Sequence, residues 1–229
     1  MNPVVTVFEP AEALKHARAI VFDFDGTLVD SNPIKRRAFE LCFSEFAEQR
    51  KDILAYCGAH HHTPRGDKFR YVYEQILRQP YTPRITRQLH TQFEMATTQQ
   101  IIEAAEIRGA TAFLNVACQT HQTALLSSTP HQMLLTILEG RGWRRWFTTV
   151  QGAPVQKANW LRRFRTSHGF SASELIFFGD SQEDADAAQT AGCLFIQIGT
   201  DSLLAEDRFH VADFMNLVRN ESHCDPAKP

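Results

Sequence analysis

Two aspartates on either side of Phe24 form the part of the sequence best suited to chemistry. They are Asp23 and Asp25, and Gly26 and Thr27 follow them directly. Side chains at positions i and i+2 of a strand share one face, so both carboxylates can point into a crevice beyond the strand end. Two close carboxylates repel unless a cation or a shared proton relieves them. Phosphoryl transfer uses such a pair, because one carboxylate attacks phosphorus, a metal ion neutralises charge and the other carboxylate protonates the leaving oxygen.

A second acidic cluster supports this interpretation over a simple turn, the common role of an Asp-Gly pair. Asp180 and Asp184 follow an apolar run late in the chain. The carboxyl ends of neighbouring parallel strands meet in one crevice, so Asp180 could bind the same metal ion. Oxygen ligands of this kind favour Mg²⁺. Ser181 and Asp184 also have the spacing of a capping box, so we expect Asp184 to cap a helix and to orient metal-bound water.

Two further side chains could contact a phosphate. Ser127 lies between an apolar run and a predicted helix start, where a hydroxyl and free backbone N–H groups form a phosphate site. Ser128 and Thr129 could instead be ordinary helix caps. Lys157 is one of many lysines, and such residues are usually solvated. Its role becomes catalytic only if it offsets the charges of the nucleophile and the phosphate.

The elements that must position these residues alternate between strand and helix. Short apolar runs predict buried parallel strands at Ala19–Phe22, Thr123–Leu126, Leu175–Phe178 and Leu194–Ile198. Between the later runs, the sequence predicts helices at Pro130–Glu139, Val155–His168 and Gln182–Ala191. This order predicts an α/β fold with right-handed crossovers and a doubly wound, Rossmann-like parallel sheet.

An all-helical block interrupts this pattern after the first predicted strand. Apolar residues recur at helical spacing at Ile34, Ala38, Leu41, Cys42 and Phe46. Thr63-Pro64 predicts a second helix start with a capping hydroxyl, and a long helix is expected over residues 83–107. We therefore expect an α/β core at residues 1–31 and 109–220, a helical insertion at 32–108 and a flexible tail at 221–229.

Composition excludes several other classes of protein. The 26 acidic and 24 basic residues give a net charge of -2, so no basic field for nucleic acid is expected. No apolar run approaches the ~20 residues that span a bilayer, and no secretory signal precedes the first strand. The five cysteines form no CxxC pair, which is typical of free thiols in a reducing cytoplasm. We expect a cytoplasmic chain, as a monomer or homodimer, that binds a small molecule.

Together, the four segments resemble the signature of the haloacid dehalogenase superfamily. They are Asp23-Phe-Asp-Gly-Thr-Leu28, Ser127 after a strand, Lys157, and Gly179-Asp-Ser-x-x-Asp184, in that order. The stretch from Asp180 to Gly192 is similar to the phosphoglycolate-phosphatase-like branch. The resemblance implies a magnesium-dependent phosphatase acting on a sugar phosphate or a phosphorylated organic acid.

The resemblance also assigns roles to the acidic residues. It implies that Asp23 is the nucleophile, which forms an aspartyl-phosphate, and that Asp25 is the general acid and base. Mg²⁺ would be held by Asp23, Asp180 and the main-chain carbonyl of Asp25, with Asp184 nearby. The helical insertion would be a cap that closes over the site and excludes water.

The remaining implied contacts concern the substrate. Ser127 and Lys157 would bind the transferring phosphoryl group, with Thr27 assisting. Within the insertion, Arg65 and Lys68 could meet a second anionic group of the substrate. The alternative for these two residues is a solvated basic helix face.

The motifs leave two other functions possible, a phosphomutase and a binding protein without turnover. Dehalogenases proper lack the second-motif aspartate, so the presence of Asp25 argues against halide displacement. Phosphonate hydrolases of the superfamily also replace that residue. Phosphomutases such as β-phosphoglucomutase retain both aspartates and remain an alternative. A binding or regulatory protein that kept the fold is the third hypothesis, and the complete set of catalytic side chains argues against it.

Overall fold

A parallel sheet forms the centre of the computed structural model, which describes residues 10–60, 63–200 and 209–221. In these residues the sheet has six strands in the order β3-β2-β1-β4-β5-β6, and every neighbouring pair is parallel. The strands are β1 (Ala19–Phe22), β2 (Gln122–Pro130), β3 (Thr149–Ala153), β4 (Leu175–Gly179), β5 (Leu194–Ile198) and β6 (Phe209–Val211). The predicted α/β class is confirmed.

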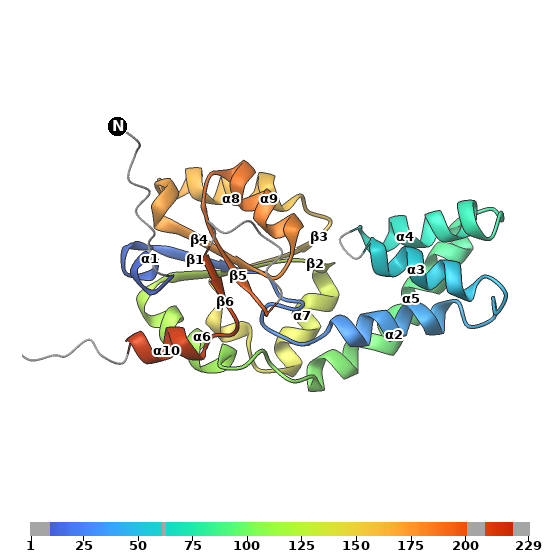
Figure 1. Ribbon diagram of the computed structural model, residues 1–229, viewed down its shortest axis with the longest axis horizontal. Helices are drawn as coiled ribbons and strands as arrows, with labels where there is room; N and C mark the ends of the chain where they lie inside the picture. The colour runs from blue at the N-terminus through green and yellow to red at the C-terminus, as the bar shows by residue number, and fades with distance from the viewer. Residues whose placement is uncertain (1–9, 61–62, 201–208, 222–229) are drawn as a thin grey trace, which may run out of the picture.

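Helices cover both faces of the sheet (Figure 1). One face carries α8 (Lys157–Ser167) and α9 (Gln182–Ala191). The other face carries α1 (Pro10–His16), α6 (Ala110–Thr120), α7 (His131–Gly140) and α10 (Met215–Glu221). Among the described residues, the connections from β1 through β5 run through helices, as a doubly wound sheet requires.

Because both faces are covered, β1 and its neighbour β4 carry no polar side chain. Along β1, Ile20 and Phe22 pack into the hydrophobic cluster on one face, while Ala19 and Val21 pack into the cluster on the other. Phe22 stacks on Phe178 of β4, with 5.4 Å between the ring centroids. This continuous burial explains why these strands could be recognised from the sequence. The same packing keeps the ends of β1 and β4 in a fixed register.

The predicted bounds of β1 and β5 are confirmed, and β4 ends one residue later than predicted. β2 is longer than predicted and runs to Pro130, so Ser127 lies within the strand rather than after it. The sequence did not predict β3 and β6, which form the two edges of the sheet. Edge strands are partly exposed, and neither contains a continuous apolar run.

The helices of the α/β core need smaller corrections. The predicted bounds of α9 are confirmed. α7 begins one residue later than predicted and α8 two residues later. The flexible tail was predicted for residues 221–229. Residues 222–229 of it lie outside the part of the chain that the structure describes.

A block of helices projects beyond one end of the sheet (Figure 1). Its helices are α2 (Asn32–Cys42), α3 (Arg50–Ala59), α4 (Arg65–Tyr71), a π-helical turn (Val72–Ile76) and α5 (Pro83–Glu103). They share a hydrophobic cluster separate from the two beside the sheet. Aromatic rings dominate it, and Phe39 packs edge-on against Phe69 and Phe93 at 5.5 and 4.9 Å between ring centroids.

Several predictions within this block were wrong in detail. Leu41 was assigned to the apolar stripe but is 39% exposed. α4 begins at Arg65 with Pro64 as its N-cap, and no side chain provides the predicted capping hydroxyl. α5 ends at Glu103 instead of near Ile107, because Ala104 adopts an extended conformation with ψ of 151°.

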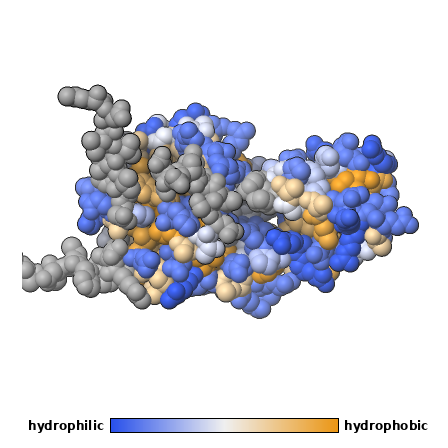
Figure 2. Space-filling model, viewed as in Figure 1, coloured by the Kyte–Doolittle hydropathy of each residue, from blue (hydrophilic) through white to orange (hydrophobic). Residues whose placement is uncertain are grey.

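Hydrophilic residues dominate the face of the molecule seen in Figure 2, over both the sheet and the helical block. No helix among the described residues combines the length and the apolar character needed to cross a bilayer.

Candidate active site

A cavity of about 640 Å³ lies between the carboxyl end of the sheet and the helical block. The predicted residues that line it from the sheet side are Asp23, Asp25, Lys157, Asp180 and Asp184. Arg65 and Lys68 line it from the helical block. The fold therefore brings together side chains that are up to 161 positions apart between Asp23 and Asp184.

Asp23 lies directly after β1, and its backbone N–H donates to the carbonyl of Phe178 at 2.8 Å. This bond continues the pairing of β1 with β4 and fixes the residue at the strand end. The side chain is buried, with 4% of the residue exposed. Burial raises the pKa of Asp23 well above its usual value, and the charge of Lys157 opposes that shift only in part. A cation beside Asp23 would favour its carboxylate form.

Lys157 provides one such cation and is not a surface lysine. It is the first residue of α8, and its ammonium donates to Asp23 Oδ1 at 2.8 Å and to Asp184 Oδ1 at 2.6 Å. Burial by itself would lower the pKa of Lys157, but the charges of Asp184 and Asp23 outweigh that effect and raise it. The ammonium therefore stays charged between the two carboxylates.

Three carboxylates converge beside this lysine. Asp23, Asp180 and Asp184 each offer an oxygen, and these oxygens lie within 4.8 Å of one another. Burial raises the pKa of Asp180 to about 7, and the charge of Asp184 adds to the shift. One ammonium leaves negative charge uncompensated in this cluster. A set of carboxylate oxygens with excess negative charge fits a hard divalent cation such as Mg²⁺.

Asp180, directly after β4, and Asp184, in the first turn of α9, differ in their partners. Asp184 is 1% exposed, its Oδ1 accepts from Lys157, and its Oδ2 accepts from the hydroxyl of Ser181 at 2.6 Å. The Ser181 hydroxyl also accepts from the backbone N–H of Asp184 at 3.2 Å, so Ser181 caps α9. The Asp184 carboxylate accepts from that hydroxyl and does not itself cap the helix, so only the serine half of the predicted capping box is confirmed. With both oxygens engaged, Asp184 is better placed to orient its neighbours than to bind an ion directly. Asp180 Oδ2 accepts from the side-chain amide of Asn32 at 3.2 Å.

Gly26 makes room for Asp180. It has a φ of +79°, and a Cβ built on it would lie 2.0 Å from Asp180 Oδ2. The next residue, Thr27, is fully buried, and its hydroxyl lies 3.4 Å from Asp180 Oδ1. The turn after Asp25 is therefore shaped around the carboxylate from the neighbouring strand.

Replacing Gly26 by alanine should weaken divalent-cation binding and lower stability. The left-handed backbone conformation costs an alanine about 1 kcal/mol, and the new methyl group must displace the Asp180 carboxylate. We expect the Mg²⁺ dissociation constant to rise about tenfold or more and the midpoint of urea unfolding to fall. Calorimetric titration with Mg²⁺ measures the first effect. An unchanged dissociation constant would contradict the role assigned to this glycine.

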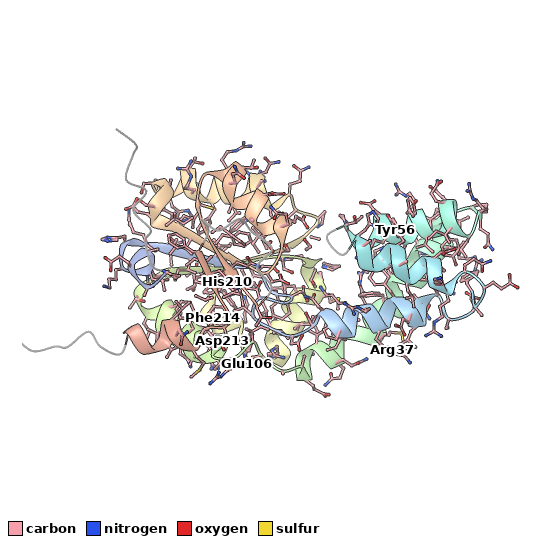
Figure 3. All side chains as sticks on the ribbon, in the orientation of Figure 1. Arg37, Tyr56, Glu106, His210, Asp213 and Phe214 are labelled. Atoms are coloured by element: carbon pink, nitrogen blue, oxygen red, sulfur yellow. The ribbon has the colours of Figure 1, made fainter. Side chains whose placement is uncertain are left out.

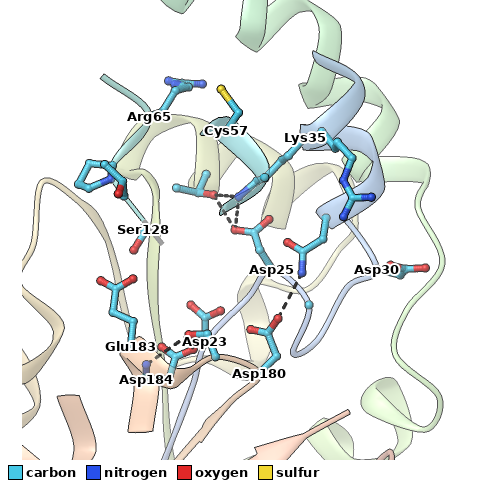
Figure 4. A pocket seen from close by; sticks show the side chains of 18 of the residues that line it. Asp23, Asp25, Asp30, Lys35, Cys57, Arg65, Ser128, Asp180, Glu183 and Asp184 are labelled. Atoms are coloured by element: carbon cyan, nitrogen blue, oxygen red, sulfur yellow. Dashed lines mark hydrogen bonds and ion pairs between the residues drawn. The ribbon is translucent and has the colours of Figure 1, made fainter. Parts of the chain in front are cut away.

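Asp25 points away from the three-carboxylate cluster and toward the helical block (Figure 4). Its Oδ1 accepts from the hydroxyl of Ser31 at 2.6 Å, and its Oδ2 lies 2.6 Å from the ammonium of Lys35. The Thr129 hydroxyl donates to Oδ2 at 2.7 Å, and that of Ser127 at 3.3 Å. Burial by itself would raise the pKa of Asp25, but Lys35, with Ser31 and Thr129, outweighs it and lowers the pKa.

Lys35, Ser31, Asn32 and Thr129 are site residues that the sequence analysis missed. Ser31 and Asn32 were noted only as a domain border, and Thr129 was considered only as a helix cap. That interpretation of Thr129 is wrong, because no side chain caps α7. One sequence signal could have identified them. Residues 31–35 follow Asp25 closely and begin a predicted helix, so the first turn of that helix must lie beside the end of β1.

The two basic residues of the helical block are not on a solvated face. The side chain of Arg65 is 12% exposed, and its guanidinium donates to Glu94 at 2.9 Å and stacks over Phe93 at 4.7 Å from the ring centroid. Lys68 is 6% exposed, with its ammonium 4.7 Å from the Phe39 ring centroid. Burial is the main cause that lowers the pKa of Lys68 to about 8. The alternative of a solvated basic face is therefore wrong for both.

Comparison with known proteins finds one matching family and several relatives. The model of the haloacid dehalogenase-like hydrolases matches residues 20–198. The phosphoglycolate phosphatase of Aliivibrio fischeri is 26% identical over 189 residues, covering 77% of this chain and 81% of the relative. That of Vibrio cholerae is 27% identical over 200 residues, covering 79% of this chain and 83% of the relative.

Solved structures share the fold. CbbY from Rhodobacter sphaeroides in complex with phosphate has a TM-score of 0.68 at 18% identity, covering 88% of this chain and 96% of that structure. A putative β-phosphoglucomutase from Thermotoga maritima has a TM-score of 0.66 at 14% identity, covering 91% of this chain and 100% of that structure.

Proposed function

The chain belongs to the haloacid dehalogenase-like hydrolase family, and we propose that it hydrolyses a small phosphate monoester with Mg²⁺ through an aspartyl-phosphate on Asp23. Its relatives are phosphoglycolate phosphatases, and it is a phosphoric monoester hydrolase. One observation carries the mechanism. The Asp23 carboxylate stands at a strand end with Lys157 at 2.8 Å and with oxygens of Asp180 and Asp184 within 4.8 Å.

The proposed first half-reaction forms the covalent intermediate. A carboxylate oxygen of Asp23 bonds to phosphorus, the bond from phosphorus to the ester oxygen breaks, and Asp25 gives its proton to that oxygen. The alcohol then leaves. A bound phosphate dianion beside Asp25 raises the pKa of this carboxyl, because a like charge disfavours the carboxylate form. The substrate thus helps Asp25 to carry the proton despite the opposing charge of Lys35.

The second half-reaction restores the enzyme. A water oxygen bonds to phosphorus, Asp25 takes a proton from that water, and the bond from phosphorus to Asp23 breaks to release inorganic phosphate. Lys157 neutralises the charge of Asp23 and of the transferring group. Ser127 and Thr27 are the hydroxyls that we propose for the same group; both are buried outside the cavity lining, with Ser127 3.3 Å from Asp25 Oδ2 and Thr27 3.4 Å from Asp180 Oδ1. Asp184 holds Lys157 in place.

Mg²⁺ would be held by Asp23, Asp180 and the main-chain carbonyl of Asp25, and when bound it would neutralise charge on the phosphoryl oxygens. Removing divalent cations with EDTA should therefore abolish phosphate release, and adding excess Mg²⁺ should restore it. A rise in the thermal unfolding midpoint on adding Mg²⁺ is expected independently of turnover, because a ligand that binds only the folded state stabilises it. Full activity in EDTA would contradict the metal site.

We propose that residues 32–108 act as a cap over a core of residues 1–31 and 109–220. A separate hydrophobic cluster and a cavity lined from both sides support this division. Lys68 is the cap residue that we propose meets an anionic group of the substrate. Arg65, which is tied to Glu94, would shape the same pocket. Closure of a cap excludes water from the reacting centre.

A phosphate-release screen with Mg²⁺ tests the function. The panel contains sugar phosphates, phosphoglycolate and nucleoside monophosphates, and we expect release from a sugar phosphate or a phosphorylated organic acid. Isomerisation of a sugar phosphate that depends on a bisphosphate, with little net release, would instead identify a phosphomutase. Mg²⁺ binding without turnover and without trapping of beryllium fluoride at Asp23 would identify a binding protein.

A further inference from the structure

A cation from the helical block holds the Asp25 side chain. Lys35 lies in the first turn of α2, with its ammonium 2.6 Å from Asp25 Oδ2 and 3.0 Å from the Thr129 hydroxyl. The side chains of Lys35 and Asp25 are 25% and 11% exposed. This ion pair therefore lies within the cavity wall and differs from the exposed pairs that contribute little to stability.

The contacts around Asp25 come from separate segments and fix both carboxylate oxygens. Ser31, in the link between β1 and α2, holds Oδ1 at 2.6 Å. Lys35 on α2 and Thr129 at the end of β2 hold Oδ2 at 2.6 and 2.7 Å. A carboxylate bound on both oxygens from different directions cannot rotate freely. Lys35 is the only member of this set that carries a charge, and charge-assisted hydrogen bonds are the stronger ones.

We propose that Lys35 is a positioning residue, which holds the Asp25 carboxyl where it can reach the ester oxygen of the substrate. This inference rests on the proposed function. The ammonium of Lys35 is directed at Asp25 and Thr129, whereas Lys157 is the lysine that contacts Asp23. A general acid must lie within hydrogen-bond distance of the atom it protonates, and a displacement of about 1 Å can cost about 10²-fold in rate.

The proposal predicts a dependence on the leaving group. An aliphatic alcohol leaves slowly unless it receives a proton as the phosphorus–oxygen bond breaks. The p-nitrophenolate ion is a good leaving group and leaves without that proton. A residue that acts through Asp25 therefore affects aliphatic esters far more than p-nitrophenyl phosphate. The ratio kcat/KM is the proper measure, because it reports the steps up to departure of the alcohol and excludes hydrolysis of the intermediate.

The experiment compares Lys35→Met and Lys35→Arg on p-nitrophenyl phosphate and on the aliphatic ester that turns over fastest in the screen. We expect Lys35→Met to lower kcat/KM for the aliphatic ester about 10-fold to 100-fold, and for p-nitrophenyl phosphate less than about threefold. Lys35→Arg should recover most of the loss. In an Asp25→Asn background, Lys35→Met should cause no further loss, because its effect passes through Asp25.

Arg37→Gln is the matched control on the same helix. Arg37, labelled on α2 in Figure 3, is 63% exposed at its side chain and pairs with Glu40 at 2.6 Å. It is not among the residues that line the cavity. We expect wild-type kcat/KM on both esters. The crystal structure of Lys35→Met gives a readout that needs no turnover. The Asp25 carboxyl should leave its contact with Thr129, and an unmoved carboxyl would overturn the proposal.

Other results have distinct meanings. Equal losses on both esters would overturn the proposal, because they would place Lys35 on the transferring phosphoryl group. A loss that persists in the Asp25→Asn background would also overturn it, because Lys35 would then contact another part of the substrate. Failure of the proposed function is recognised separately, by the absence of phosphate release from every ester with the wild-type protein.

Discussion

Replacing Asp23 by asparagine should abolish phosphate release, with kcat lowered at least about 10³-fold. The amide lacks the nucleophilic oxygen that the carboxylate provides, while its size is nearly the same. The fold should survive, because the backbone bond to Phe178 is unchanged. Reaction with a ³²P-labelled substrate, quenched in acid, should leave radioactive phosphate on the wild-type protein and none on the variant.

The matched control for this variant is Asp186→Asn. Asp186 lies on α9 but is exposed, and its carboxylate accepts from Gln182 at 2.6 Å. We expect wild-type kcat from it, because it makes no contact with the three-carboxylate cluster in the described residues. Turnover by the Asp23→Asn variant, or labelled phosphate retained on it, would exclude Asp23 as the nucleophile.

Replacing Lys157 by methionine should lower both kcat and the free energy of unfolding. The ammonium offsets the charges of Asp23 and Asp184, which are 4% and 1% exposed. Removing one partner of a buried ion pair typically costs about 3–5 kcal/mol in the free energy of unfolding. We expect kcat to fall about 10²-fold to 10³-fold, because the charge that stabilises the transferring phosphoryl group is lost.

Urea unfolding with and without Mg²⁺ separates the two effects. In divalent-free buffer the variant should show the full loss in the free energy of unfolding. Saturating Mg²⁺ should recover part of it, because a divalent cation also offsets the carboxylates. Lys51→Met is the control, since Lys51 is an exposed lysine on α3. A Lys157→Met variant as stable as the wild type in divalent-free buffer would refute the charge balance inferred for the site.

The first turn of α2 links the helical block to both parts of the site. Asn32 donates to Asp180 at 3.2 Å, and Lys35 contacts Asp25 at 2.6 Å. The position of α2 therefore affects Asp180, which would bind the metal ion, and Asp25, which would transfer the proton. The same helix packs its Phe39 ring against Phe69 and Phe93 of the block. A movement of the helical block would therefore also shift the side chains that contact Asp25 and Asp180.

The sequence by itself determined the centre of the sheet and the acidic residues at the strand ends. A strand buried on both faces is largely apolar, so β1 and β5 could be recognised from local composition alone, although β5 contains the buried Gln197. An Asp that directly follows such a strand must lie at the carboxyl edge of the sheet. Asp23 and Asp180 could therefore be assigned to one crevice before any distance was known.

Only the tertiary structure decided the partners of those residues. Lys35 and Thr129 are 94 positions apart, and Lys157 and Asp23 are 134 apart. A lysine has the same local sequence signature whether it is solvated or buried in an ion pair, because its environment is made by distant segments. The edge strands β3 and β6 depend in the same way on their neighbours for hydrogen bonds. Local composition carries the burial pattern, but the pairing of charges arises only when the chain is folded.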